Sequence, residues 1–149
     1  MKTVSVNRKA YHDYEVLETA EAGLVLKGSE IKAIREGRIN LREAFAGTIK
    51  GELWLYNAHI AQYSKAGLNK HEPTRPRKLL LHREEIDHLA AEVGQKGYTL
   101  VPLKLYFKKH VAKVELGLVR GRRVYDKREV IAKRDAEREK QRAIKSARG

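Results

Sequence analysis

Apolar and polar residues alternate with a period of two along much of the first 120 positions, which is the pattern of half-buried β-strands. Turn residues between these runs divide them into about six strands. Pro102 lies within one run and requires an edge position or a β-bulge there, because proline has no N–H to donate to a ladder. We predict strands over residues 14–27 (two short strands with a turn at 19–23), 41–49, 52–57, 98–107 and 112–119.

Two segments show the 3.6-residue period of a helix instead. In residues 28–37, Ser29 is a candidate N-cap and Gly37 a candidate left-handed stop. Residues 79–93 also have helical spacing, with Gly94 as the predicted end. The connections between strands are short or loop-like, which argues against βαβ crossovers. The expected fold class is mainly β, a small antiparallel OB-like barrel of about six strands with two or three packed helices.

The last part of the chain differs in composition from the rest. It is rich in Ala, Glu, Lys, Arg and Gln, and its large apolar residues are few, chiefly Val130, Ile131 and Ile144. Such a segment is compatible with a helix but cannot cover a core face, so we expect disorder in the free protein and a helix in the bound one. The predicted domains are a barrel over residues 1–120 and a basic C-terminal tail over residues 121–149.

Charge indicates the class of partner. The chain of 149 residues carries 32 Lys or Arg against 19 Asp or Glu, a net charge of +13. From Arg120 onward there are 12 basic and 5 acidic residues, so the tail is the most densely positive segment. A surplus of this size favours a polyanion, meaning nucleic acid or an anionic membrane, over a merely soluble basic protein.

Two segments combine basic residues with other groups that nucleic acids bind. Residues 4–14 mix basic, amide and aromatic side chains, and could be either a contact surface or a polar N-terminal arm. Residues 62–77 form the longest irregular region and contain Pro73, Pro76 and several cations, as expected of a mobile functional loop or of a solvated linker. Among the aromatic residues, Tyr125 in the tail is the one we expect to stack on a base.

No arrangement of residues indicates catalysis or a bound cofactor. There is no cysteine, no P-loop and no Gly-x-Ser-x-Gly elbow. Glu84 and His88 are spaced to share a helix face, but a third metal ligand is missing. His12 and Asp13 could form an acid/base pair, but neighbours in sequence point apart in a strand. We therefore expect no catalytic residue, metal or cofactor, and keep a small nuclease using His12, or Glu84 with His88, as the enzyme alternative.

The beginning of the chain and its hydropathy bear on localisation. The first ten residues lack the apolar run of a signal peptide, and no segment approaches the roughly 20 apolar residues of a membrane span. We expect a cytoplasmic, monomeric protein with no membrane partner.

Several short motifs, in order and spread over nearly the whole chain, resemble those of the SsrA-binding protein (small protein B) family. Together they are far more specific than any one alone. They are residues 7–14 (NRKAYHDY), 21–24 (EAGL), 28–35 (GSEIKAIR), 52–55 (ELWL), 73–81 (PTRPRKLLL), 96–99 (KGYT) and 121–128 (GRRVYDKR).

The resemblance implies an OB-like barrel that binds the tRNA-like part of transfer-messenger RNA and delivers it to stalled ribosomes for trans-translation. It implies as partners that RNA, the small ribosomal subunit at its decoding centre and message channel, and elongation factor Tu with GTP indirectly, through the charged RNA. The tail would sense the empty message channel. A generic module that binds single-stranded nucleic acid is the alternative.

The resemblance also implies two sets of site residues. The RNA-binding set is Asn7, Arg8, Lys9, Glu21, Arg35, Arg75, Arg77, Lys78 and Leu80. The set that faces the decoding centre and message channel is His12, Arg120, Arg122, Arg123, Tyr125, Asp126, Lys127, Arg128, Lys133 and Arg134.

Overall fold

Six antiparallel strands close into a ring, and a seventh extends it. The computed structural model describes residues 2–62 and 70–121. Its strands are β1 (Lys2–Val6), β2 (Tyr14–Leu24), β3 (Ile39–Asn40), β4 (Phe45–Ile49), β5 (Glu52–Tyr56), β6 (His59–Ile60), β7 (Arg77–Leu80), β8 (Thr99–Lys108) and β9 (Val111–Gly121). Its helices are α1 (Arg8–Asp13), α2 (Gly28–Arg35) and α3 (Arg83–Lys96).

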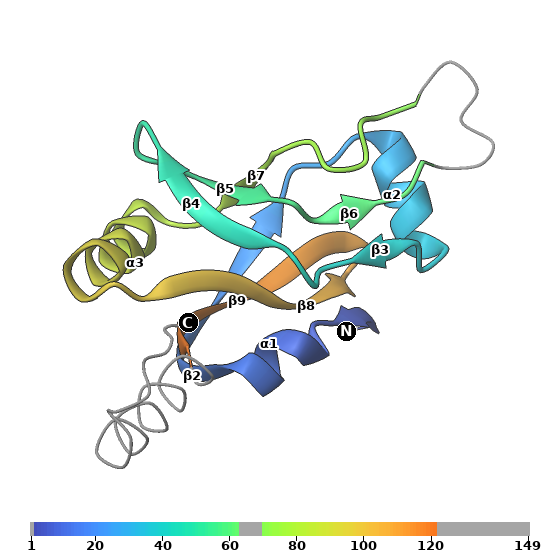
Figure 1. The fold of residues 1–149 in the computed structure, drawn as a ribbon. Coiled ribbons are helices and arrows are strands. Elements are labelled where there is room, and N and C mark those ends of the chain that lie inside the picture. Colours follow the sequence, from blue (N-terminus) through green and yellow to red (C-terminus); the bar gives the residue numbers. More distant parts are fainter. Residues whose placement is uncertain (1, 63–69, 122–149) are drawn as a thin grey trace, which may run out of the picture.

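The ring runs β8-β4-β5-β7-β2-β9 and closes through the pairing of β9 with β8 (Figure 1). β8 has room for a further neighbour because it pairs with β4 only near its start, at Leu100, and with β1 near its end. The register of β8 against β9 shifts between Pro102 and Lys104, which is the bulge that the proline requires. The predicted barrel of about six strands is therefore confirmed.

Two tight turns join neighbouring strands of the ring. Lys50 and Gly51 connect β4 to β5 with φ values of 52° and 78°. Lys109 and His110 connect β8 to β9 with φ values of 52° and 70°. Positive φ at both central positions matches the right-handed twist of the flanking strands, and both turns lie where the sequence predicts them.

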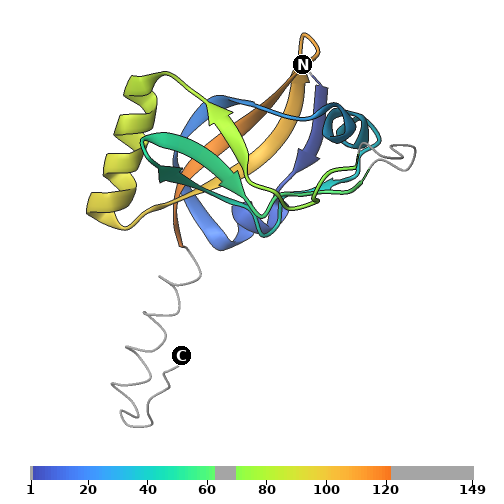
Figure 2. The ribbon, with the colours of Figure 1, turned by 90° about the horizontal axis from the view of Figure 1, so that it is seen from above.

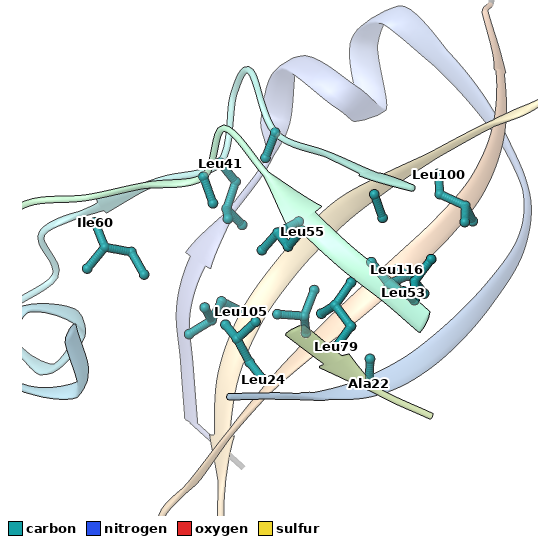
Figure 3. Close-up of a cluster of buried hydrophobic side chains, with 14 of the residues drawn as sticks. Ala22, Leu24, Leu41, Leu53, Leu55, Ile60, Leu79, Leu100, Leu105 and Leu116 are labelled. Atoms are coloured by element: carbon teal, nitrogen blue, oxygen red, sulfur yellow. The ribbon is translucent and has the colours of Figure 1, made fainter. Parts of the chain in front are cut away.

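The barrel interior is filled by aliphatic side chains from every strand of the ring (Figure 3). Leu53 and Leu55 alternate along β5 with Trp54, and both leucines are fully buried. Burial of one such leucine stabilises the fold by roughly 2 kcal/mol. From the helices, Ile34 of α2 and Ile86 and Leu89 of α3 complete this core.

A second, smaller core lies on the outside of the barrel. Ala10 of α1 packs with Val101, Leu103 and Val119 of β8 and β9. α1 therefore covers the outer face of these strands at the end where β2 begins. The two other helices lie at opposite ends of the barrel (Figure 2).

Two local predictions were wrong. Residues 14–24 form one continuous strand, with a bulge between Val16 and Glu18, because Gly23 sits within the ladder between Leu80 and Lys113. The segment from 79 begins as strand β7, and the helix starts only at Arg83 and continues through Gly94 to Lys96. Of the two alternatives left open for residues 4–14, the polar arm does not apply, since these residues end β1 and form α1.

The ends of α2 and α3 also differ in detail from prediction. α2 has Lys27, not Ser29, as its N-cap, whereas Gly37 has the expected positive φ of 76° just beyond its end. α3 ends at Gly97, which takes the left-handed conformation in place of Gly94. Within the described residues, no helix is long and apolar enough to cross a membrane.

Candidate nucleic-acid interface

Asn7 fixes the position of α1. Its side-chain oxygen accepts from the Ala10 backbone N–H at 3.1 Å, and its amide donates to the carbonyl oxygens of Leu41 and Pro102 at 3.0 and 2.9 Å. The residue is 2 % exposed. In this conformation the side-chain polar atoms of Asn7 are all engaged in the interior, and its predicted contact with RNA stays a prediction. Its role is to hold the helix that carries Arg8, Lys9 and His12.

The exposed side of α1 forms the first basic surface, defined here as the α1 surface: Arg8, Lys9, His12 and Arg42. These residues line a hollow of about 570 Å³ between α1 and the β3 region. Lys9 is paired with Glu43 at 3.2 Å. Sequence reasoning missed Arg42, which lies 34 positions from Arg8 and comes beside it only through the fold.

His12 is paired within the α1 surface. Its Nδ1 lies 2.9 Å from Asp13 Oδ1, and its side chain is 74 % exposed. The prediction that these neighbours point apart was wrong, because it assumed a strand where a helix forms. A carboxylate only accepts, so Nδ1 is the donor in this contact.

The second surface is the part of the β2, β8 and β9 outer face that α1 leaves uncovered, extended by Leu80. We call it the open face and define it by Glu21, Leu80, Tyr106, Lys108 and Lys113. Tyr106 donates its hydroxyl hydrogen to Glu21 Oε2, and Lys108 Nζ lies 3.6 Å from the same oxygen. Leu80 is 52 % exposed although it is aliphatic. These residues come from four strands, and the barrel brings them together.

The pKa values on the open face are set by this network. The hydrogen bond from Tyr106, with the charges of Lys108 and Lys113, holds the pKa of Glu21 below its ordinary value despite opposing desolvation. Burial and the bond to Glu21 raise the pKa of Tyr106 above its ordinary value. Glu21 is thus an ionised acceptor whose position is fixed by Tyr106.

Lys113 and Tyr106 were not among the predicted site residues. Both were treated only as positions in strands, and their polar groups lie on the outer side of those strands. The available signal was the alternation itself, because polar positions of a buried strand must face outward.

Two arginines of the predicted basic loop, Arg75 and Arg77, form hydrogen bonds within the protein. Arg77 is fully buried, and it donates to Glu30 Oε2 at 2.8 Å and to the Ala58 carbonyl at 2.7 Å. Arg75 donates to Glu30 Oε1 at 2.7 Å and keeps about a quarter of its side chain exposed. In this conformation the guanidinium of Arg77 is buried and bonded to protein acceptors, so its predicted contact with RNA stays a prediction that this geometry does not favour.

This arrangement also corrects the description of the segment as a mobile loop. Glu30 holds Arg75 and Arg77, and the buried His71 lies 2.8 Å from the Ile60 carbonyl through Nε2 and 2.9 Å from Ser29 through Nδ1. Residues 70–77 are therefore fastened to α2 and β6. The rest of the predicted loop, residues 63–69, lies outside the described residues.

The remaining predicted residues are dispersed. Lys78 is paired with Glu52 at 3.6 Å on β5, and Arg35 lies over the ring of Phe107. Arg120 belongs to β9 and is paired with Glu15. The other predicted tail contacts lie outside the described residues: Arg122, Arg123, Tyr125, Asp126, Lys127, Arg128, Lys133 and Arg134.

The residues considered for an enzyme are not brought together. His88 Nε2 lies 2.8 Å from Glu18 on β2, so His88 and Glu84 do not form a ligand pair. Residues 2–62 and 70–121 contain no cluster of three or more His, Cys, Asp or Glu side chains suited to a metal ion.

The comparison with known families decides what this barrel is. The family model described as "SmpB protein" matches residues 4–146. The chain belongs to the SmpB family. The α1 surface and the open face therefore both lie on a barrel of SmpB type, and the matched segment extends from β1 into the tail.

Individual relatives agree with this assignment. The SsrA-binding protein of Carboxydothermus hydrogenoformans is 57 % identical over 145 residues, which cover 97 % of each chain. That of Chloroflexus aurantiacus is 60 % identical over 146 residues, 97 % of this chain and 91 % of the relative. A solved SmpB chain, from the work "tmRNA-SmpB: a journey to the center of the bacterial ribosome", superposes with a TM-score of 0.72 at 49 % identity, covering 90 % of this chain and 94 % of its own.

Proposed function

We propose that this protein binds the tRNA-like part of transfer-messenger RNA and carries it to stalled ribosomes for trans-translation. The proposal rests on one observation: the residues matched to the SmpB family carry two separate polar surfaces at the two ends of β2. Glu21 is seven residues from Tyr14 at the α1 end, which corresponds to roughly 20 Å along a strand. Two RNA partners can therefore be engaged at once.

The open face is the part that binds transfer-messenger RNA. Lys108 and Lys113 neutralise phosphates and release their counterions. Glu21 cannot approach a phosphate favourably, so its carboxylate accepts from a ribose 2′-hydroxyl or from a base amino group. Leu80 supplies apolar contact beside them. Tyr106 keeps the carboxylate in place without itself facing the RNA, since it is 5 % exposed.

The α1 surface and the tail are the parts that face the small ribosomal subunit. Gly121 is the partner of Tyr14 in the β2–β9 ladder, so the tail starts beside the end of α1. We place His12 at the decoding centre and residues 121–149 in the message channel, with residues 1–120 as the RNA-binding domain. Elongation factor Tu with GTP takes part indirectly, through the charged RNA.

This role requires no catalytic residue or cofactor of the protein's own. The protein acts as a binding factor, as a monomer, in the cytoplasm where ribosomes stall. The competing function is a generic single-strand binding module. It is favoured by the stacked pair Phe45 and Tyr56, whose ring centroids are 5.3 Å apart on the outside of β4 and β5.

Competition binding separates these two functions. Full-length protein is titrated into labelled tRNA-like RNA with an excess of ordinary tRNA or single-stranded DNA. Retained affinity supports the proposed function, whereas equal competition by either nucleic acid supports the generic module.

Variants of the open face then locate the binding site. Lys113→Ala should lower the affinity about tenfold and reduce the slope of log affinity against log salt by about one. Glu21→Gln should also weaken binding, although it makes the protein more positive, because a specific acceptor is lost. Lys50→Ala, which removes one exposed charge from the β4–β5 turn, is the control. If Lys113→Ala and Lys50→Ala behave alike, the open face is not the site.

A further inference from the structure

A groove of about 890 Å³ lies next to the open face, in the range of pockets that hold small organic ligands. It is bounded by β1, by the C-terminal end of α2 and by the β8–β9 turn, which Figure 2 shows on the same side of the barrel. Lys109 and His110 line the groove and directly follow Lys108 of the open face in the chain. The groove and the open face therefore meet at the β8–β9 turn.

The groove is positively charged. Lys2, Arg35 and Lys109 line it, and none of them forms an ion pair with a carboxylate that the structure describes. The acidic residue in the lining, Glu36, is paired with Arg38 at 3.7 Å. Three cations around one hollow, none paired with a described carboxylate, favour an anionic ligand.

The groove also offers a planar surface. The guanidinium carbon of Arg35 lies 5.7 Å from the centroid of the Phe107 ring, which is half-buried. An arginine held over an aromatic ring presents a flat, weakly hydrated cation, and nucleobases stack on such planes. An inorganic anion would be bound by the cations alone and would make no stacking contact with the guanidinium above the ring.

The β8–β9 turn, at the rim of the groove, has two residues other than glycine at positive φ, a backbone conformation that is unfavourable for residues with a side chain. The β4–β5 turn has Gly51 at its second central position, where a positive φ causes no strain. The β8–β9 turn has the same geometry but places His110 there, with φ of 70°. Backbone strain of this kind is retained where the surrounding structure or function requires the side chain. His110 and Lys109 both line the groove.

We infer that this groove holds one unpaired nucleotide of the bound RNA, with its base stacked on Arg35 above Phe107 and its phosphate held by Lys109 and Lys2. The inference rests on the proposed function, since it adds a contact to the RNA that the open face binds. It makes recognition depend on a base that is free to leave its helix, and not on charge alone.

Affinity for the tRNA-like RNA, measured with full-length protein at low and high salt, tests this inference. Phe107→Leu keeps an apolar side chain in place but removes the ring that supports the Arg35 guanidinium. It should weaken binding about tenfold at both salt concentrations, because the stacking of a base on that guanidinium is not screened by salt. Arg35→Gln should weaken it at least as much. Lys109→Ala should weaken it mainly at low salt.

The control is Lys50→Ala, which removes the same charge from the same position of the other turn, where φ is also 52°. It should change the affinity less than about twofold, because Lys50 does not line the groove. His110→Gly adds a second readout: it should leave the melting temperature unchanged or higher, yet weaken RNA binding.

The outcomes distinguish this inference from the function on which it rests. If the wild-type protein itself lacks competitor-resistant binding, the proposed function fails. If the wild-type protein binds and all groove variants match Lys50→Ala, the function stands and the groove inference is overturned. A loss confined to Lys109→Ala would also overturn it, since the groove would then contribute only charge.

Discussion

Arg77 Nε donates to Glu30 Oε2 at 2.8 Å, and neither side chain is exposed to solvent. This buried pair joins α2 to the start of β7, and through further bonds of Arg77 it holds the Ala58 and Pro73 carbonyls. Glu30 also accepts from the Lys27 backbone N–H at 2.7 Å, which closes the first turn of α2. One carboxylate therefore organises a helix end, a strand start and the segment between them.

Removing the charge of Glu30 should destabilise the fold strongly. Glu30→Gln leaves the Arg77 guanidinium buried without its counter-charge, so the free energy of unfolding should fall by about 3 kcal/mol or more. Urea denaturation followed by circular dichroism measures this. Arg38→Ala, which breaks the exposed pair with Glu36, is the control and should cost less than about 1 kcal/mol. Similar losses in the two variants would contradict the role assigned to Glu30.

The carboxylate of Glu30 should also make the free energy of unfolding fall as the solution becomes acidic. Burial acts to raise the pKa of Glu30, but hydrogen bonds from Arg75, the Lys27 N–H and Arg77 together hold it below the ordinary 4.5. A depressed folded-state pKa gives stability that is fully present above about pH 4.5 and is lost as the pH falls through the folded-state value. Below pH 4.5, wild-type stability should therefore fall with a slope steeper than that of Glu30→Gln by up to about 1.4 kcal/mol per pH unit. Parallel slopes would exclude Glu30 as the source.

The small core under α1 should not tolerate an added methyl group. A Cβ on Gly117 would lie 2.8 Å from Leu103 Cδ1, and Leu103 is fully buried between α1 and the barrel. Gly117→Ala should lower the free energy of unfolding by about 1–3 kcal/mol. Gly94→Ala is the matched control, because no atom outside the neighbouring helix backbone lies within 4 Å of a Cβ added at this exposed position of α3. It should stabilise by about 0.5–1 kcal/mol, and thermal melts of the two variants should move in opposite directions.

Removing the tail should separate two activities. A chain ending at Gly121 keeps all of β9, so its stability should change by less than about 0.5 kcal/mol. Its binding to the tRNA-like RNA should be largely retained, while tagging of stalled peptides in a reconstituted translation reaction should be abolished. If the affinity for the RNA were lost with the tail, the proposed division between barrel and tail would be wrong.

Local patterns predicted the strands of the barrel well and its polar interior poorly. Alternation identifies β5 and β9 because each residue's environment there follows from its neighbours two positions away. Asn7 and Arg77 gave the opposite result: both were assigned to RNA, but their partners lie 34, 95 and 47 positions away in sequence. A polar residue in a basic segment has the same local pattern whether it binds phosphate or closes the core.

The misplaced start of α3 has a related cause. Leu79 and Leu80 have helical spacing to later apolar residues, yet Leu79 pairs with Leu53 in the sheet. The helix begins after His82, whose backbone N–H donates to Glu85 at 3.1 Å. Histidine is not a typical N-cap, so only the position of Glu85 indicated this boundary.

The two longest ladders of the sheet both involve β9, which pairs with β2 on one side and with β8 on the other. The tail continues from this strand at Gly121. A force that pulls the tail along the strand axis loads the bonds of both ladders in parallel instead of opening them one pair at a time. With the tail in the message channel, as proposed above, a moving ribosome would pull on the strand that shares the two longest ladders of the described residues, and the barrel would act as a mechanical anchor.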